Sequence, residues 1–243
     1  MTASTPTIVA TSGGYRPGRR TPLELDALVR HAVDRAGVSG RTPRLGYLGT
    51  ANGDQQFRIA MMAEAARLSG YELRPLTLFT MPNVEDVEAY LLEADVLWVD
   101  GGSVANLLAV WRVHSLDEIF PRVWQAGVVL AGISAGSICW FTGGTTDSYG
   151  PPLQPVTDGL GLLPYGNGVH YDSEDGRRPL VHALVGAGTL PETYCTDDGA
   201  GLVFEGTHLA EVVTERDGAA GYLVRRSADG SVVEERLGAR RLP

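Results

Sequence analysis

A serine stands between glycines at the end of a short apolar run. The segment Val128–Phe141 passes through small and β-branched residues to the turn Gly132-Ile133-Ser134-Ala135-Gly136, and then continues with a helical pattern. A Gly-x-Ser-x-Gly turn between a strand and a helix strains the serine backbone, exposes the hydroxyl and lets the next amide stabilise an oxyanion. A tight turn that buries its serine is the alternative interpretation. The strand–turn–helix context favours Ser134 as a nucleophile.

A serine nucleophile needs a base, and none of the 20 basic residues of this chain is a lysine. The base is therefore expected among the five histidines. His170 lies in the glycine-rich, polar segment LLPYGNGVHYDSEDGRRP, and loops of this kind often carry functional residues. A surface-loop histidine is the alternative. The remaining histidines fit helix faces, a helix junction or a hairpin turn: His31, His114, His182 and His208.

A catalytic histidine is usually oriented by a carboxylate. Asp147 follows the serine and precedes the histidine, at a predicted strand end. The other candidates are Asp172, Glu174, Asp197 and Asp198. The last two precede a glycine-rich turn, where turn formation alone would explain them. Spacing by itself leaves the choice open.

Composition narrows the classes of function. The net charge of −9 disfavours a nucleic acid or an anionic membrane as partner. The absence of lysine excludes Schiff-base, Ser–Lys and P-loop chemistry. The two cysteines, Cys139 and Cys195, provide neither paired metal ligands nor a disulfide framework. With no secretory pattern at the start and no long apolar run, we expect a cytoplasmic protein that needs no metal or cofactor.

The elements that would position these residues alternate along the chain. Helical patterns are predicted over residues 21–37, 54–70, 83–94 and 104–127, the last in two pieces, and β-rich runs over 7–14, 44–51, 71–79 and 95–103. Such alternation predicts an α/β fold with a parallel sheet covered on both faces and ligands at the strand carboxyl ends. Beyond residue 186, short strands and Asp-Gly turns predict an antiparallel extension of one domain spanning residues 1–243.

Three segments in this order resemble the peptidase E group of serine peptidases, the family that also holds cyanophycinase. They are DGGSVANLL (100–108), GISAGSICWF (132–141) and HYDSEDGRRP (170–179). The resemblance covers most of the chain. It implies a three-layer α/β/α sandwich related to class I glutamine amidotransferases, with a serine in the nucleophile position.

The resemblance also implies roles for individual residues. Ser134 matches the nucleophile, His170 the general base and Asp147 the third member of the triad. The Gly101-Gly102 turn and the Ala135 amide match the oxyanion hole. The chain departs from the family pattern at Ser103, where an asparagine is usual, and at Tyr171, where a phenylalanine is more common.

The same resemblance suggests a substrate. Peptidase E prefers dipeptides that begin with aspartate, and an arginine after the histidine is implicated in that preference. Arg177 and Arg178 lie in the corresponding region. The expected substrate is therefore a short peptide with N-terminal aspartate, and a homodimer is left open.

Two other functions compete with a serine exopeptidase. An α/β-hydrolase esterase usually has its histidine near the chain end and an HGG-type oxyanion loop upstream, and this sequence has neither. A catalytically silent binding or regulatory domain would not need the Ser, His and Asp residues that are present here.

Overall fold

The central sheet has eight strands. The computed structural model describes residues 3 and 5–243 of the chain. The strand order is β16-β13-β12-β1-β7-β6-β4-β5, and the five strands from β1 to β5 in this order are parallel. Their bounds are β1 Thr7–Thr11, β4 Arg44–Leu48, β5 Glu72–Leu76, β6 Val96–Val99, β7 Val129–Ile133, β12 Ala200–Glu205, β13 His208–Thr214 and β16 Arg240–Arg241.

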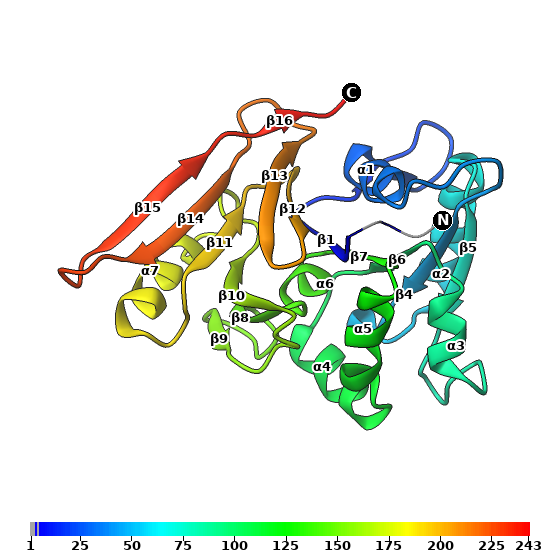
Figure 1. Ribbon diagram of the computed structural model, residues 1–243, viewed down its shortest axis with the longest axis horizontal. Coiled ribbons are helices and arrows are strands. Elements are labelled where there is room, and N and C mark those ends of the chain that lie inside the picture. Colours follow the sequence, from blue (N-terminus) through cyan, green and yellow to red (C-terminus); the bar gives the residue numbers. More distant parts are fainter. Residues whose placement is uncertain (1–2, 4) are drawn as a thin grey trace.

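Helices cover both faces of this sheet because the strands are apolar on both sides (Figure 1). Along β1, Val9 packs in one core cluster, whereas Ile8 and Ala10 pack in the other, as the two-residue period of a strand requires. The first layer holds α1 Ala27–Arg35 and α2 Gln56–Leu68. The second holds α3 Val87–Leu92, α4 Val104–Val113, α5 Leu116–Gln125 and the short α6 Ala135–Ile138. The α/β/α prediction is confirmed.

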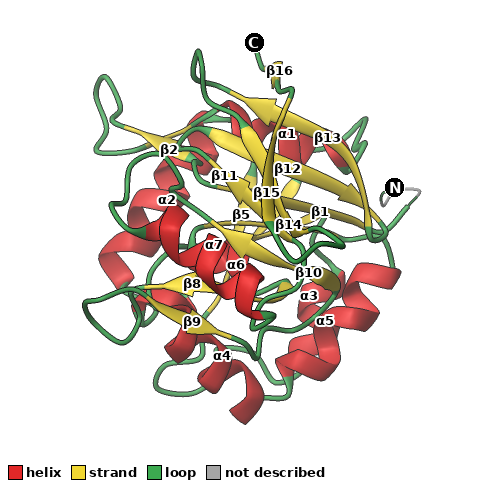
Figure 2. Cartoon of the chain, turned by 90° about the vertical axis from the view of Figure 1, so that its left-hand side faces the viewer, coloured by secondary structure: helices red, strands yellow, loops and turns green. Residues whose placement is uncertain are grey.

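A second sheet of six strands adjoins the first. Its order is β15-β14-β11-β10-β8-β9, and β8, β10 and β11 run parallel. Helix α7 lies against this sheet (Figure 2). Val181 and Val185 make the contact. The bounds are β8 Phe141–Thr146, β9 Gln154–Val156, β10 Leu163–Gly168, α7 Arg177–Ala187, β11 Thr193–Thr196, β14 Gly221–Arg226 and β15 Val232–Leu237.

The predicted antiparallel extension is present, but it is divided between the two sheets. The hairpin of β12 and β13 joins the central sheet by pairing antiparallel with β1. The hairpin of β14 and β15 joins the second sheet through β11. The sequence pattern did not indicate this division. The assignment of residues 1–243 to a single domain stays a prediction.

The first helix begins later than its sequence pattern suggested. Residues Glu24–Leu25 form strand β3, which pairs with β2 (Tyr15–Arg16), so the helix predicted from residue 21 begins only at Ala27. Asp26 caps α1 instead, and its carboxylate accepts hydrogen bonds from the Leu28 and Val29 amides. The long helical pattern after β6 is broken as predicted, at Ser115, whose φ is 56°. Among the described residues, no helix is both long and apolar enough to cross a membrane.

Candidate active site

Ser134 occupies a strained turn at the carboxyl end of β7. Its backbone has φ 57° and ψ −114°, a region that side-chain-bearing residues rarely adopt. The neighbouring glycines are required by close backbone approach. A Cβ on Gly132 would lie 2.3 Å from the Gly136 oxygen, and a Cβ on Gly136 would lie 2.2 Å from the Val99 oxygen. The turn predicted around the serine is therefore present.

The Gly101-Gly102 turn lies beside this serine. A Cβ on Gly101 would lie 3.3 Å from the Cβ of Ser134. Gly102 has φ 139°, and a Cβ there would lie 2.3 Å from the Ala51 oxygen. The Gly101 amide donates to its neighbour Asp100 at 2.9 Å. Among the described residues, the Gly102 and Ala135 amides have no hydrogen-bond acceptor, so these two donors near Ser134 are without a partner.

A buried carboxylate holds the double-glycine turn. Asp100 is 3% exposed and accepts the Gly101 amide on one oxygen. Its other oxygen accepts from the Tyr47 hydroxyl at 2.6 Å and from Arg58 Nε at 2.8 Å. Sequence reasoning missed Asp100, although it directly precedes the glycines. A pocket of about 350 Å³ adjoins this turn, with Tyr15, Asn52, Gln55, Phe57, Arg58, Asp100, Gly101 and Ile133 in its wall.

His170 and Ser134 are anchored to consecutive residues at the end of β1. The Ser134 amide donates to the Thr11 oxygen at 3.1 Å. The His170 amide donates to the Ser12 hydroxyl at 3.0 Å, and His170 itself has φ 52°. The buried Ser12 hydroxyl also contacts the Thr196 hydroxyl at 2.6 Å, which ties the end of β11 to the same point. Ser12 was not among the sequence candidates, although the Gly13-Gly14 pair marks its strand end.

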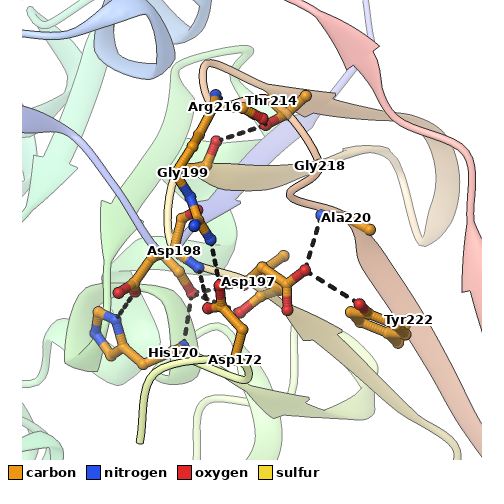
Figure 3. A network of polar contacts seen from close by, with 12 residues as sticks. His170, Asp172, Asp197, Asp198, Gly199, Thr214, Arg216, Gly218, Ala220 and Tyr222 are labelled. Carbon is orange, nitrogen blue, oxygen red and sulfur yellow. Dashed lines mark hydrogen bonds and ion pairs between the residues drawn. The ribbon is translucent and has the colours of Figure 1, made fainter.

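The carboxylate in contact with His170 is Asp198. The distance from His170 Nδ1 to Asp198 Oδ1 is 2.6 Å (Figure 3). The assignment of Asp147 to this position is therefore corrected. Asp147 is exposed at the end of β8, in the wall of a separate pocket of about 730 Å³ that also includes Asp175 and Leu180.

The strand register explains why two carboxylates competed for this position. Strand β10, which leads to His170, lies between β8 and β11. Asn167 is paired with Gly144 on one side, and Gly168 is paired with Cys195 on the other. The chain segments that follow all three strands therefore meet at one edge of the sheet, and Asp147 and Asp198 reach it from opposite sides of His170.

Neither arginine expected to bind a substrate carboxylate is free. Arg177 is 2% exposed, donates through Nε to Glu174 at 3.1 Å and contacts Thr145 through Nη1. Arg178 stacks over the Tyr171 and Tyr222 rings at 4.6 and 4.7 Å, and its Nε lies 3.7 Å from Glu234. Arg177 is thus a buried cross-link, whereas the Arg178 side chain is 44% exposed.

Charged side chains surround the Asp198 loop. Asp197 accepts from the Ala220 amide and the Tyr222 hydroxyl at 3.0 and 3.1 Å, and burial raises its pKa. Partial burial opposes ionisation of Asp172, but hydrogen bonds from the Asp198 amide and Arg216 outweigh it and lower the pKa of Asp172. Over the described residues, no group of three or more His, Cys, Asp or Glu side chains could hold a metal ion.

Comparison with known proteins points to a single family. Residues 9–212 match peptidase family S51. The uncharacterized peptidase YgaJ of Bacillus subtilis (strain 168) is 38% identical over 217 residues, which is 89% of this chain and 91% of that protein.

Two solved structures share the fold. A peptidase from an acI-B1 actinobacterium superposes with a TM-score of 0.67 at 19% identity, over 97% of this chain and 95% of the other. A candidate peptidase E protein from Listeria monocytogenes EGD-e gives a TM-score of 0.57 at 14% identity, over 97% and 100% of the two chains.

Proposed function

Because this chain belongs to peptidase family S51, we propose that it is a serine-dependent hydrolase of short peptides, with Ser134, His170 and Asp198 as its triad. One observation carries the proposal. The strained serine turn and the His170–Asp198 pair are both anchored to Thr11 and Ser12, at a single strand end. A strained nucleophile, a base and a carboxylate that orients the base are the parts that acyl transfer requires.

The geometry supports a separate role for each of the two ring nitrogens of His170. Asp198 contacts Nδ1 of His170, so a proton held on Nδ1 leaves Nε2 as the acceptor. In the proposed reaction, Nε2 takes the proton of the Ser134 hydroxyl as the oxygen attacks the scissile carbonyl carbon. The same proton then passes to the leaving amine, and the acyl group stays on Ser134 until water releases it by the reverse sequence.

The oxyanion formed in each step needs hydrogen-bond donors. The proposed donors are the Gly102 and Ala135 amides, which have no acceptor among the described residues. Gly101 supplies the close approach to Ser134 rather than a donor, since its own amide is bonded to Asp100.

We also propose a preference for substrates with N-terminal aspartate, with Arg178 alone, and not Arg177, as the residue that binds the substrate carboxylate. A substrate carboxylate is best bound by a guanidinium, which can form two parallel hydrogen bonds. Arg177 has too many internal partners for this role. Arg178 is the better candidate, because its head group is partly exposed, its contact with Glu234 is long and it packs on Tyr171, the neighbour of His170. A cytoplasmic location and a homodimer stay predictions from the sequence.

Replacing Ser134 by alanine tests the proposal directly. We expect hydrolysis of dipeptides to fall by about 10³-fold or more, because triad members act as a unit. Labelling by a fluorophosphonate should be lost as well, and the thermal midpoint should stay close to that of the wild type. Ser115, a serine that also has a positive φ (56°) directly before a helix and whose side chain makes no capping hydrogen bond, provides the matched control through Ser115→Ala. A wild-type chain that hydrolyses no dipeptide and resists labelling would instead indicate a silent binding domain.

A further inference from the structure

Both polar groups of the Asp198 backbone, the amide and the carbonyl oxygen, are hydrogen-bonded to side chains. Its amide donates to Asp172 Oδ1 at 2.8 Å, and its carbonyl oxygen accepts from Arg216 Nε at 2.9 Å. Arg216 also forms an ion pair with Asp172 through Nη2 and Oδ2. The three groups close a ring around one residue, as Figure 3 shows.

The members of this ring come from three separate segments. Asp172 lies two residues after His170, Asp198 follows β11, and Arg216 lies in the turn between β13 and β14. That turn is itself fixed to the Asp198 loop, because the Glu215 amide donates to the Gly199 oxygen at 2.9 Å. The ring therefore links the segment of the proposed base to the segment of its proposed carboxylate.

The Asp198 side chain needs such support. It is 43% exposed, and its residue belongs to none of the apolar clusters, so packing alone does not hold its carboxylate. An exposed carboxylate exchanges a hydrogen bond to histidine for one to water at little cost. Holding the backbone on both sides of Asp198 limits the directions in which its side chain can point.

We propose that Asp172 and Arg216 act as positioning residues, which clamp Asp198 so that its carboxylate stays on Nδ1 of His170. The inference rests on the proposed triad. The clamp touches neither the reacting atoms nor the substrate, so it acts on the rate of the chemical step through Asp198. The sequence offered Asp172 only as a candidate carboxylate for orienting His170 directly, and it did not indicate Arg216, which lies in an Asp-Gly turn that reads as an ordinary hairpin.

The alternative is an ordinary surface ion pair, and the chain provides a matched control. Arg122 and Glu88 form an ion pair with 54% and 33% side-chain exposure, close to the 51% and 30% of Arg216 and Asp172. Arg122 and Glu88 join α5 to α3 and contact none of the proposed triad. Exposed pairs of this kind contribute little to stability.

The test compares Arg216→Gln and Asp172→Asn with Arg122→Gln. We expect kcat to fall by about 10- to 100-fold in the first two variants, because a displaced catalytic group loses rate steeply. The KM and the thermal midpoint should change little. Arg216→Lys should recover only part of the rate, since an ammonium can pair with Asp172 but lacks the fork that also reaches the Asp198 oxygen.

A double-variant cycle tests whether Arg216 influences the rate through Asp198. In the Asp198→Asn background, adding Arg216→Gln should not slow fluorophosphonate labelling of Ser134 further, because there is no carboxylate left to position. Equal losses in both backgrounds, or Arg216→Gln activity matching that of Arg122→Gln, would overturn the clamp. If Arg216→Gln does not fold, Arg216→Lys and Asp172→Asn enter the same cycle. Retained activity in Ser134→Ala would be a failure of the proposed function, a separate result.

Discussion

The nucleophile and its proposed base are held by different means. Around Ser134 the constraint is backbone against backbone, since Gly132 and Gly136 leave no room for a Cβ. Around His170 the constraint is a set of polar side chains: Ser12 holds its amide and Asp198 its ring. The first region depends on residue size, whereas the second depends on charge and hydrogen bonding.

The two regions should therefore respond differently to substitution, one by losing the fold and the other by losing catalytic geometry. Because backbone packs directly against Gly132 and Gly136, any side chain added there should disrupt folding as well as activity. A hydrogen-bonded pair with side-chain exposures of 21% and 43% can lose its geometry while the fold persists. Changes on the histidine side should therefore alter activity more than stability.

The largest expected effect on that side follows from Asp198→Asn. An amide at this position can donate to Nδ1 of His170 and so stabilise the tautomer that cannot accept the serine proton. We expect kcat to fall on the order of 10³- to 10⁴-fold. The fall in kcat can be measured by steady-state dipeptide hydrolysis, and the thermal midpoint should be nearly unchanged.

Asp147→Asn is the matched variant for this experiment. Asp147 is also an aspartate after a parallel strand of the second sheet, but its carboxylate is exposed and His170 has Asp198 as its partner. Its activity should stay close to that of the wild type. A crippled Asp147→Asn with a nearly normal Asp198→Asn would restore the role that the family resemblance gave to Asp147.

Local sequence was sufficient for the serine and insufficient for its partners. The Ser134 turn is encoded within five consecutive residues, so its pattern could be read directly. The choice between Asp147 and Asp198 depends on which neighbour of β10 turns its carboxylate toward His170, and spacing along the chain carries no such information. The partners of Arg177 were equally hidden, because Thr145 lies 32 residues away in the sequence.

Local sequence was likewise sufficient for some strands of the fold and insufficient for others. Alternating apolar runs revealed the parallel strands of the central sheet, of which β1, β6 and β7 are buried along nearly their whole length. Strand β10 escaped notice because LPYGNG reads as a turn, and β8 was indicated only by the strand end predicted at Asp147, since FTGGTT also reads as a turn. Their glycines are required by close packing, since a Cβ on Gly144 would lie 2.2 Å from the Asn167 oxygen.

A smaller effect is expected from the arginine proposed to read the substrate. Arg178→Ala should lower kcat/KM for Asp-Xaa dipeptides by about 10- to 150-fold and spare Asn-Xaa dipeptides, because one charge-assisted contact is lost. The neutral substrate also controls for any movement of Tyr171, against which Arg178 packs. Arg177→Ala should instead reduce folding stability. Equal wild-type rates for Asp-Xaa and Asn-Xaa would remove the aspartate preference and leave the serine hydrolase intact.

The smallest expected effect concerns a carboxyl pair that links α1 to the turn carrying Arg216. Burial, reinforced by the nearby Glu215, raises the pKa of Asp26 to about 7. The folded chain therefore holds a proton at Asp26 that the unfolded chain has already released above about pH 4. The free energy of unfolding should consequently decrease as the pH rises from about 4 to 7, and this loss should be complete above pH 7.

Asp26→Asn should remove that part of the pH dependence. An asparagine oxygen can still accept from the Leu28 amide, while its NH₂ group can donate to Glu215 without any ionisation. We expect the variant to gain about 1–2 kcal/mol relative to the wild type between pH 5 and pH 8. Urea unfolding at both pH values measures the gain. Asp86→Asn, at the exposed cap of α3, is the control and should show no such trend. Equal differences between variant and wild type at pH 5 and pH 8 would show that Asp26 does not hold the proton.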